Sequence, residues 1–455
     1  MNPKIVLLIS FISAFLSFSA ADETSKVPAF PGAEGFGASA LGGRGGRVVE
    51  VTTLANDGPG SLRQACYAEG PRIVVFRIGG LIELQTDIKI SNPFLTIAGQ
   101  SAPGDGICLK SGTLRVCTHD VVIRFIRARV GDGPSGVSPE NRDALKIEGS
   151  DVHNIMVDHC SFSWAIDENV STWATPHDIT IQWCIVAEGL LWSLHPKSHA
   201  AKGKVPHSMG LLIGRSTNRV TIHHCLMAHN NMRNPLLQID SVQSPSDLDC
   251  RNNVVYNFGT CASVAAGNIR LNYMGNYLKR GTNSTSEKEL AIDLDRKGSG
   301  GCPQVFLAGN IGPNNLDGRD DNWKMVWDMK TLGEGKVRVK EPFPFPGATT
   351  EDAHASYEAV LLSAGATRPV RDAVDARIVK DVREGTGRII NSTSEVGGWP
   401  EYRSAAPLPD SDHDGIPDEW ETAHGLNPND PSDGPKDKDG DGYTNVEEFL
   451  NETQP

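Results

Sequence analysis

The sequence contains no long apolar run beyond its first twenty residues and no dense group of cysteines. A membrane-spanning helix needs about 20 consecutive apolar residues, so we expect no such helix in the chain. The cysteines are widely spread, unlike those of a small disulfide-stapled domain. Because their number, nine, is odd, at least one must stay unpaired, and the spacing leaves the pairing of the others open.

The N-terminal segment has the pattern of a secretory signal peptide. Lys4 precedes an apolar run at 5–18, and small residues follow at 19–21. A run of about 14 apolar residues is too short to span a bilayer as a helix. We therefore predict that residues 1–21 are cleaved and that the mature protein is secreted and extracellular.

Acidic charge is concentrated at the other end of the chain. The formal net charge is −13, but residues 410–455 alone contain 14 acids and 2 lysines, and the rest of the chain holds 42 acids and 41 bases. A body without net charge can still present a basic groove. The overall acidity therefore does not exclude a negatively charged substrate.

Short strand-like segments recur between about residue 90 and residue 312. Examples are HNIMVDHCSFS, HDITIQWCIVA and NRVTIHHCLMA, in each of which apolar and polar residues alternate. Such alternation is typical of β-strands. Repetition at irregular intervals of about 20–40 residues indicates stacked turns joined by loops of variable length.

When these segments are aligned, six residues share one phase: Cys160, Cys184, Cys225, Asn253, Asn276 and Asn310. Successive coils of a parallel β-helix place equivalent residues about 4.8 Å apart. Asn at such a position can satisfy backbone groups inside the coil, and Cys packs as a small apolar residue. A β-sandwich also has alternating strands, but it would not keep one polar position in phase. We therefore predict an all-β fold, a parallel β-helix.

Residues 349–387 change to a helical pattern. Segments 349–366 and 371–387 are predicted to be amphipathic helices, with a capping box formed by Thr349 and Asp352. We expect them to pack on the flank or the end of the β-helix. Proline-rich stretches on either side divide the chain into a signal peptide (1–21), a β-helix domain (22–345), a helical flank and linker (346–405) and a C-terminal module (406–455).

The C-terminal module contains two copies of a calcium-loop spacing. Acidic and amide residues alternate, a glycine occupies position six (Gly415 and Gly442) and a glutamate occupies position twelve. This arrangement wraps oxygen ligands around one hard cation. The predicted Ca²⁺ ligands are Asp410, Asp412, Asp414, Asp418 and Glu421 in the first copy, and Asp437, Asp439, Asp441, Asn445 and Glu448 in the second.

This module resembles dockerin-like and thrombospondin type 3-like repeats of exported enzymes. We expect it to order with calcium and to unfold by self-repulsion without it. The alternative is an acidic disordered linker. Stability, surface attachment and docking to a surface or scaffold partner all remain open as its role.

Three motifs in the body carry chemistry: NRDALKI at 141–147, VDHCSFSWAIDEN at 157–169 and IHHCLMAHNNMRNP at 222–235. Together with GAEGFG, GGRGG and GPGSLRQA nearer the N-terminus, they make residues 28–330 resemble the pectate lyase family. These enzymes are polysaccharide lyases built on a right-handed parallel β-helix. The resemblance implies a secreted enzyme that cleaves pectate or polygalacturonate by calcium-assisted β-elimination.

The resemblance also implies roles for individual residues. Asp143 and Asp167 match ligands of a catalytic Ca²⁺, and Arg233 matches the catalytic arginine. The chain departs from the family at several positions: Asn141 stands where an Asp is usual, Ser171 replaces a carboxylate that Glu168 could supply, Gln238 replaces a second arginine, and His207 stands near the place of a substrate lysine. Candidates for binding the substrate are therefore His207, Lys202, Arg127, Lys204, Arg215 and Gln238.

The identity of the base stays open on chemical grounds. Arginine normally has a pKa above about 12, which makes it an unusual proton acceptor. Arg233 could instead be an electrostatic clamp, with His207 as the base. The motif pairs Asp158–His159 and His223–His224 are better explained as structural hydrogen-bonded pairs.

Two other functions are compatible with a β-helix. Glycoside hydrolases that act on polygalacturonate use paired carboxylates as acid and base, and the sequence shows no such acidic cluster apart from the expected calcium ligands. A non-catalytic glycan-binding surface protein would need only the solenoid and the C-terminal module. It would leave the spacing of the three motifs unexplained.

Overall fold

The structure is a computed structural model. It describes residues 27–134, 136–201, 203–240, 244–285, 289–293, 301–319, 321–327 and 337–452. The predicted signal peptide lies outside these ranges. Within them, no helix is both long enough and apolar enough to cross a membrane.

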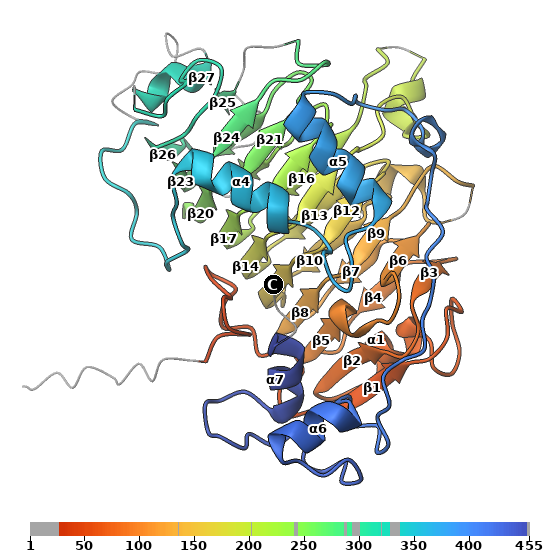
Figure 1. Cartoon of the computed structure of the whole chain (residues 1–455). Helices are drawn as coiled ribbons and strands as arrows, with labels where there is room; N and C mark the ends of the chain where they lie inside the picture. Colours follow the sequence, from red (N-terminus) through yellow and green to blue (C-terminus); the bar gives the residue numbers. More distant parts are fainter. Residues whose placement is uncertain are drawn as a thin grey trace, which may run out of the picture.

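The strands form three sheets in which every pairing is parallel (Figure 1). The ten-stranded sheet contains β1 (Arg47–Val51), β2 (Arg72–Phe76), β5 (Leu95–Ala98), β8 (Val121–Arg124), β11 (His153–Asp158), β14 (His177–Gln182), β17 (Asn218–His223), β20 (Ser246–Arg251), β23 (Ile269–Met274) and β26 (Gln304–Ala308). The nine-stranded sheet contains β4 (Ile88–Ile90), β7 (Leu114–Val116), β10 (Leu145–Gly149), β13 (Glu168–Ala174), β16 (Met209–Ile213), β19 (Leu236–Ile239), β22 (Ser263–Gly267), β25 (Leu290–Asp293) and β27 (Val326–Trp327). The eight-stranded sheet contains β3 (Gly80–Glu83), β6 (Ile107–Lys110), β9 (Arg127–Arg129), β12 (Ser161–Ser163), β15 (Ile185–Ala187), β18 (Leu226–Ala228), β21 (Val254–Tyr256) and β24 (Tyr277–Lys279).

The chain visits the three sheets in turn, so each coil contributes one strand to each sheet, and the predicted parallel β-helix is confirmed. The described helices lie outside the β-helix: α1 (Leu62–Tyr67), α4 (Ala353–Ser363), α5 (Ala373–Glu384), α6 (Asp418–His424) and α7 (Asn445–Glu452). Short 3-10 turns occur at Gly99–Ser101, Pro139–Asn141, Pro196–His199, Asn322–Met325 and Thr393–Val396.

The in-phase residues form the expected ladder inside the coils. The Asn253 side-chain oxygen accepts from the Cys225 backbone N–H at 2.9 Å, and Asn276 accepts from Asn253 at 3.0 Å. Asn310 accepts from Asn276 at 2.9 Å, and Asn322 adds a further rung by accepting from Asn310 at 2.7 Å. Each amide thus satisfies a buried N–H of the coil before it, which the strands alone would leave without a partner.

A second ladder marks the corner that follows the ten-stranded sheet. Phe125, His159, Trp183 and His224 all have left-handed backbone conformation, with φ between +48° and +55°. Their rings stack in order with centroid separations of 5.0, 5.8 and 4.3 Å. His159 also contacts Asp158 at 2.8 Å between Nδ1 and Oδ1. These contacts offset the cost of a left-handed corner, and they agree with the structural interpretation of the Asp158–His159 pair.

Helices α4 and α5 cover the outer face of the eight-stranded sheet, as expected (Figure 1). Their buried Val360 and Ile378 belong to the same apolar cluster as Ile185 and Val254 of the sheet. Asp352 caps α4 by accepting from the His354 N–H at 2.9 Å. The predicted capping box is wrong in its other half, because Thr349 bonds to the Glu34 carboxylate.

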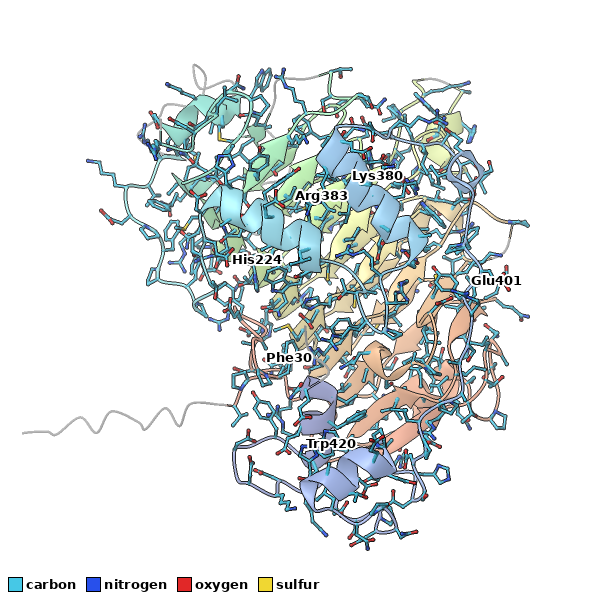
Figure 2. All side chains as sticks on the ribbon, viewed as in Figure 1. Phe30, His224, Lys380, Arg383, Glu401 and Trp420 are labelled. Atoms are coloured by element: carbon cyan, nitrogen blue, oxygen red, sulfur yellow. The ribbon has the colours of Figure 1, made fainter. Side chains whose placement is uncertain are left out.

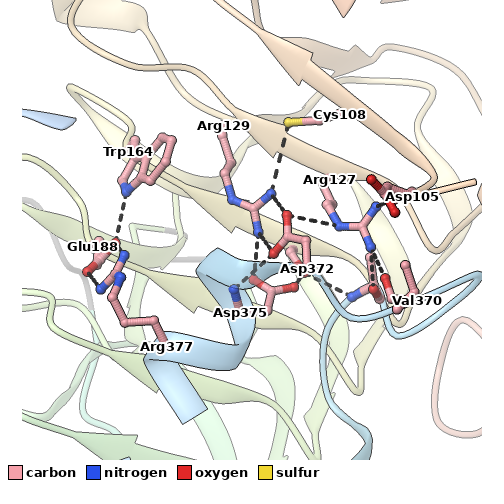
Figure 3. A network of polar contacts seen from close by, with 12 residues as sticks. Asp105, Cys108, Arg127, Arg129, Trp164, Glu188, Val370, Asp372, Asp375 and Arg377 are labelled. Atoms are coloured by element: carbon pink, nitrogen blue, oxygen red, sulfur yellow. Dashed lines mark hydrogen bonds and ion pairs between the residues drawn. The ribbon is translucent and has the colours of Figure 1, made fainter. Parts of the chain in front are cut away.

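Two arginines buried beneath these helices join the flank to the solenoid (Figure 3). Arg129 contacts Asp372 and Asp375, each at 2.7 Å. Arg127 contacts Asp372 at 3.4 Å and donates to the carbonyl oxygens of Ala366 and Val370. Both guanidinium groups are fully buried. Burial alone would raise the pKa of Asp372, but Arg129 and Arg127 outweigh it and lower that pKa to about 2.

Replacing Asp372 by Asn should destabilise the protein by about 3 kcal/mol near neutral pH, because it leaves two buried cations short of a carboxylate. The Asp372 pKa is lowered on folding, so its stabilising effect is present above the unfolded value of about 4 and is lost as the pH falls towards 2. Urea unfolding at several pH values should show the difference between parent and variant narrowing in that window. A difference that stayed constant from pH 7 to pH 2 would contradict this assignment.

Candidate active site

A groove of about 440 Å³ lies on the outer face of the nine-stranded sheet. Residues of β10, β13, β16 and β19 and of their flanking loops line it: Asn141, Lys146, Glu148, Asp167, Glu168, Ser171, Trp173, Lys197, Leu212, Gly214, Arg215, Arg233, Leu236, Gln238 and Asp240. Strand alternation explains the composition, because Leu145 and Ile147 point into the core while Lys146 and Glu148 face the groove.

Three carboxylates converge at one side of the groove. One oxygen from each of Asp143, Asp167 and Glu168 lies within 4.8 Å of the others. Asp143 is fully buried and accepts hydrogen bonds from Ser171 Oγ at 2.5 Å and from the Glu168 backbone N–H at 3.3 Å. Burial, followed by the charge of Asp167, raises the pKa of Asp143 to about 7. Ionising the buried Asp143 carboxyl is therefore costly, and a cation bound beside it would lower that cost.

Arg233 lines the groove beside these acids, and its Nη1 forms an ion pair with Glu168. The loop that carries it is fixed from below. Asn230 is fully buried and bonds to the Val186 carbonyl and to Asn234. The Arg233 carbonyl accepts from the Leu211 N–H at 2.6 Å.

Gly210 makes the position of this loop possible. A Cβ at Gly210 would lie 2.5 Å from the Arg233 carbonyl oxygen, so any side chain there would push the arginine loop outward. Asn230 and Gly210 are therefore positioning residues for Arg233.

Two buried histidines contact the Asp167 carboxylate. His207 Nε2 lies 2.7 Å and His195 Nε2 lies 3.7 Å from Asp167 Oδ1. Their rings stack at 3.7 Å, and both side chains are almost completely buried. Burial, followed by the charge of His207, lowers the pKa of His195 to about 4. His207 is not among the residues that line the groove, so it contacts the acid cluster rather than the open space.

Curated relatives match nearly the whole chain. Probable pectate lyase C of Aspergillus fumigatus is 34% identical over 462 residues, covering 100% of this chain and 98% of that protein. Probable pectate lyase C of Aspergillus flavus is 33% identical over 442 residues and covers 95% of both. No family model matches. The chain belongs to the pectate lyase family. This family comprises polysaccharide lyases.

Solved structures agree on the fold of this pectate lyase homologue. A pectate lyase bound to a hexasaccharide superposes with a TM-score of 0.53 at 14% identity, over 76% of this chain and 99% of that one. The major cedar pollen allergen jun a 1 gives a TM-score of 0.52 at 17% identity, over 73% and 92%. These likenesses confirm the predicted right-handed parallel β-helix.

Most of the site residues predicted in this pectate lyase homologue lie together. Asp143, Asp167 and Glu168 form the acid cluster, and the groove is lined by Asn141, Arg215, Arg233 and Gln238. Gln238 donates to Asp240 at 3.1 Å, and Arg215 lies over the Trp173 ring at 4.5 Å.

One of the substrate-binding predictions, Arg127, is wrong, and a second, Lys204, stays an untested prediction. Arg127 is on the eight-stranded sheet and fully buried under the helical flank, so it cannot reach the groove. Lys204 is exposed on the loop before β16 and does not line the groove. Lys202 falls outside the described residues.

Sequence reasoning missed several lining residues. Lys146 is three residues after Asp143 in the first motif, with Nζ 3.7 Å from the Asp143 carboxylate, and strand alternation would have placed it outward. Lys197 belongs to the 3-10 turn at Pro196–His199, whose position follows from no periodicity. Trp173 is outward on β13 and 41% exposed, a signal that the alternating pattern did contain.

Replacing Trp173 by Ala should raise the KM for the polysaccharide about 10-fold and leave kcat within about 2-fold, because an aromatic face beside the groove contributes binding that does not change during the reaction. Steady-state kinetics measure both constants. Trp327→Ala is the matched control, since Trp327 is 48% exposed on β27 and lies outside the groove. Equal KM values for the two variants would contradict this role.

Proposed function

We propose that the protein is a secreted lyase that cleaves a pectate-like polyuronate by calcium-assisted β-elimination. One observation carries the proposal: Arg233 faces the groove beside the converging carboxylates of Asp143, Asp167 and Glu168. The names of the curated relatives support pectate as the substrate. Secretion rests on the sequence pattern of residues 1–21.

The groove has the cations that a polyuronate requires. Lys146, Lys197 and Arg215 line it together with Arg233. Each can pair with a sugar carboxylate, and Arg215 can do so in bidentate fashion. Trp173 offers an aromatic face beside them. With a divalent cation bound at the acid cluster, this arrangement would suit a chain of charged sugars better than a neutral glycan.

The acid cluster fits a calcium ion. Asp143, Asp167 and Glu168 would hold it, with Asn141 at the rim of the groove, since Ca²⁺ prefers carboxylate and amide oxygens. The raised pKa of Asp143 supports this assignment, because a cation would favour the ionised form of that buried acid. When bound, Ca²⁺ would withdraw charge from the uronate carboxylate and make the C5 proton more acidic.

Arg233 is the better candidate for the base. Its side chain lines the groove, whereas His207 is buried and its Nε2 is engaged by Asp167. In the proposed reaction Arg233 first releases a guanidinium proton to water and then, as a neutral base, accepts the C5 proton; the C–H electrons form the C4–C5 double bond, and the bond from C4 to the glycosidic oxygen breaks. The leaving oxygen takes a proton from water. His195 and His207 fix Asp167 and take no part in proton transfer.

The assay that tests this function is the ultraviolet absorbance of the unsaturated product. Incubating the mature protein with polygalacturonate and Ca²⁺ should produce chain cutting together with rising absorbance, because only elimination creates the double bond. Cutting without absorbance would identify a hydrolase, and no cutting at all would favour a glycan-binding protein. Both outcomes contradict the proposal.

In the same assay, Arg233→Lys should lower kcat about 100-fold or more, as expected for loss of a positioned base. The loss should persist when the pH is raised, because lysine lacks the planar fork that pairs with Glu168. Arg219→Lys is the control, since Arg219 is exposed on β17 and pairs with Asp178. Recovery of most of the activity at high pH would show that no special property of arginine is needed.

A further inference from the structure

The C-terminal module is docked on the first coils of the β-helix. Figure 1 shows α6 and α7 beside β1, β2 and β5, and Figure 2 shows Trp420 on α6 in the same place. Ile416, Val446 and Leu450 are almost completely buried and belong to one apolar cluster with Ile73 and Val75 of β2. The module therefore covers part of the ten-stranded sheet.

The first calcium loop contains buried carboxylates that lack protein partners. Glu421 is fully buried, and neither of its oxygens has a hydrogen-bond partner. Asp414 is 5% exposed, and its Oδ2 also lacks one. One oxygen from each of Asp414, Glu421 and Asp433 lies within 4.8 Å of the others.

The set of converging residues differs from the one predicted by loop spacing. Asp418 at position nine accepts from the Ser411 N–H at 2.7 Å and from Ser411 Oγ at 2.8 Å, whereas Asp433 Oδ1 is buried and accepts no hydrogen bond. Asp433, from the segment between α6 and α7, approaches the loop instead. Gly434 permits this approach, because a Cβ there would lie 2.4 Å from Asp414 Oδ2.

We propose that Asp410, Asp412, Asp414, Glu421 and Asp433 bind one Ca²⁺, and that this ion locks the module onto the first coils of the β-helix. All five donors are carboxylates. One oxygen from each of Asp410, Asp412 and Asp414 lies within 4.8 Å of the others, so Asp414 belongs to this group as well as to the group with Glu421 and Asp433. A hard divalent cation that takes six to eight oxygen ligands fits this set. It would also supply the partner that Glu421 lacks.

The loop is mechanically connected to the solenoid. Gly415, at position six, has φ +90°, and a Cβ on it would lie 3.1 Å from both methyl groups of Val48 on β1. Asp410 pairs with Arg77 at 3.4 Å, directly after β2. Gly415 and Asp410, which belong to the calcium loop, thus also contact the first coils of the β-helix. Without the cation, repulsion among the buried acids would open the loop and loosen this contact.

In the second loop, Glu448 Oε1 is buried and accepts no hydrogen bond, but the Glu448 residue as a whole is half-buried rather than enclosed like Glu421. Asp437, Asp439 and Asp441 are exposed, and their ligand role stays a prediction. Asn445 is buried, but its side chain donates to the Asp433 carbonyl at 2.8 Å. Asn445 therefore connects the second loop to Asp433 of the proposed site.

The test uses the full-length protein after removal of metal, with calorimetric titration of CaCl₂ and limited proteolysis as readouts. The parent should bind Ca²⁺, and the ion should slow cleavage within residues 406–452. Glu421→Gln and Asp433→Asn should each bind one Ca²⁺ fewer per chain and lose that protection. Asp430→Asn should behave as the parent, because the Asp430 carboxylate accepts hydrogen bonds from Ser432 within its own turn and the substitution leaves the backbone contacts in place.

Asp418→Asn separates the proposed set of ligands from the one that loop spacing predicts. It should keep the full calcium stoichiometry, whereas a spacing-defined site would lose one ion. Normal binding by Asp433→Asn, or equal cleavage with and without Ca²⁺ in the parent, would overturn the proposal. Circular dichroism of the β-helix confirms that each variant is folded. Lyase activity is not a readout, so this test is independent of the proposed active site.

Discussion

Stacking of parallel strands in register is the constraint on which the other features of this protein depend. Backbone hydrogen bonds hold successive coils about 4.8 Å apart, so any residue type repeated in phase must meet its equivalent above and below. The side chains of Asn276 and Asn310 satisfy this constraint by hydrogen bonding: each accepts from the backbone N–H of the preceding asparagine in the ladder, Asn253 and Asn276 respectively. His159 and Trp183, which repeat in phase at a corner of left-handed backbone conformation, satisfy the constraint by stacking their rings. The same register brings β10, β13, β16 and β19 side by side, and their outward side chains become one groove.

This register explains why much of the protein could be predicted from its sequence. Cys and Asn residues that recur at the same position of successive sequence segments predict side chains stacked on one another in successive coils, and the structure contains this ladder. The positions of Asp143, Asp167 and Arg233 follow from motifs that lie on strands or directly beside them, where spacing converts into position.

The errors arise where position does not follow from periodicity. Arg127 and Lys146 both alternate outward on their strands, but the eight-stranded sheet is covered by α4 and α5 while the nine-stranded sheet stays open at the groove. Which face is covered depends on residues more than 200 positions later, such as Asp372. Lys204 and Lys197 belong to one irregular loop, and only its folded path decides which lysine reaches the groove. The proposed calcium ligand Asp433 could not be predicted for the same reason, since it comes from outside the twelve-residue spacing.

Charge balance then limits how the groove can work. Its lining includes four acids (Glu148, Asp167, Glu168 and Asp240) and four bases (Lys146, Lys197, Arg215 and Arg233), so these side chains carry no net charge. Glu168 is shared, because it belongs to the acid cluster and is also the ion-pair partner of Arg233. A polyuronate would gain little attraction from such a balanced surface. A divalent ion at the cluster would make the groove positive and would also share Glu168 with Arg233, lessening the hold of that ion pair on the guanidinium. The proposed ion would therefore have two effects: it would attract the polyuronate, and it would weaken the ion pair that holds the Arg233 guanidinium. Both effects depend on the carboxylate of Glu168, which contacts Arg233 and belongs to the acid cluster.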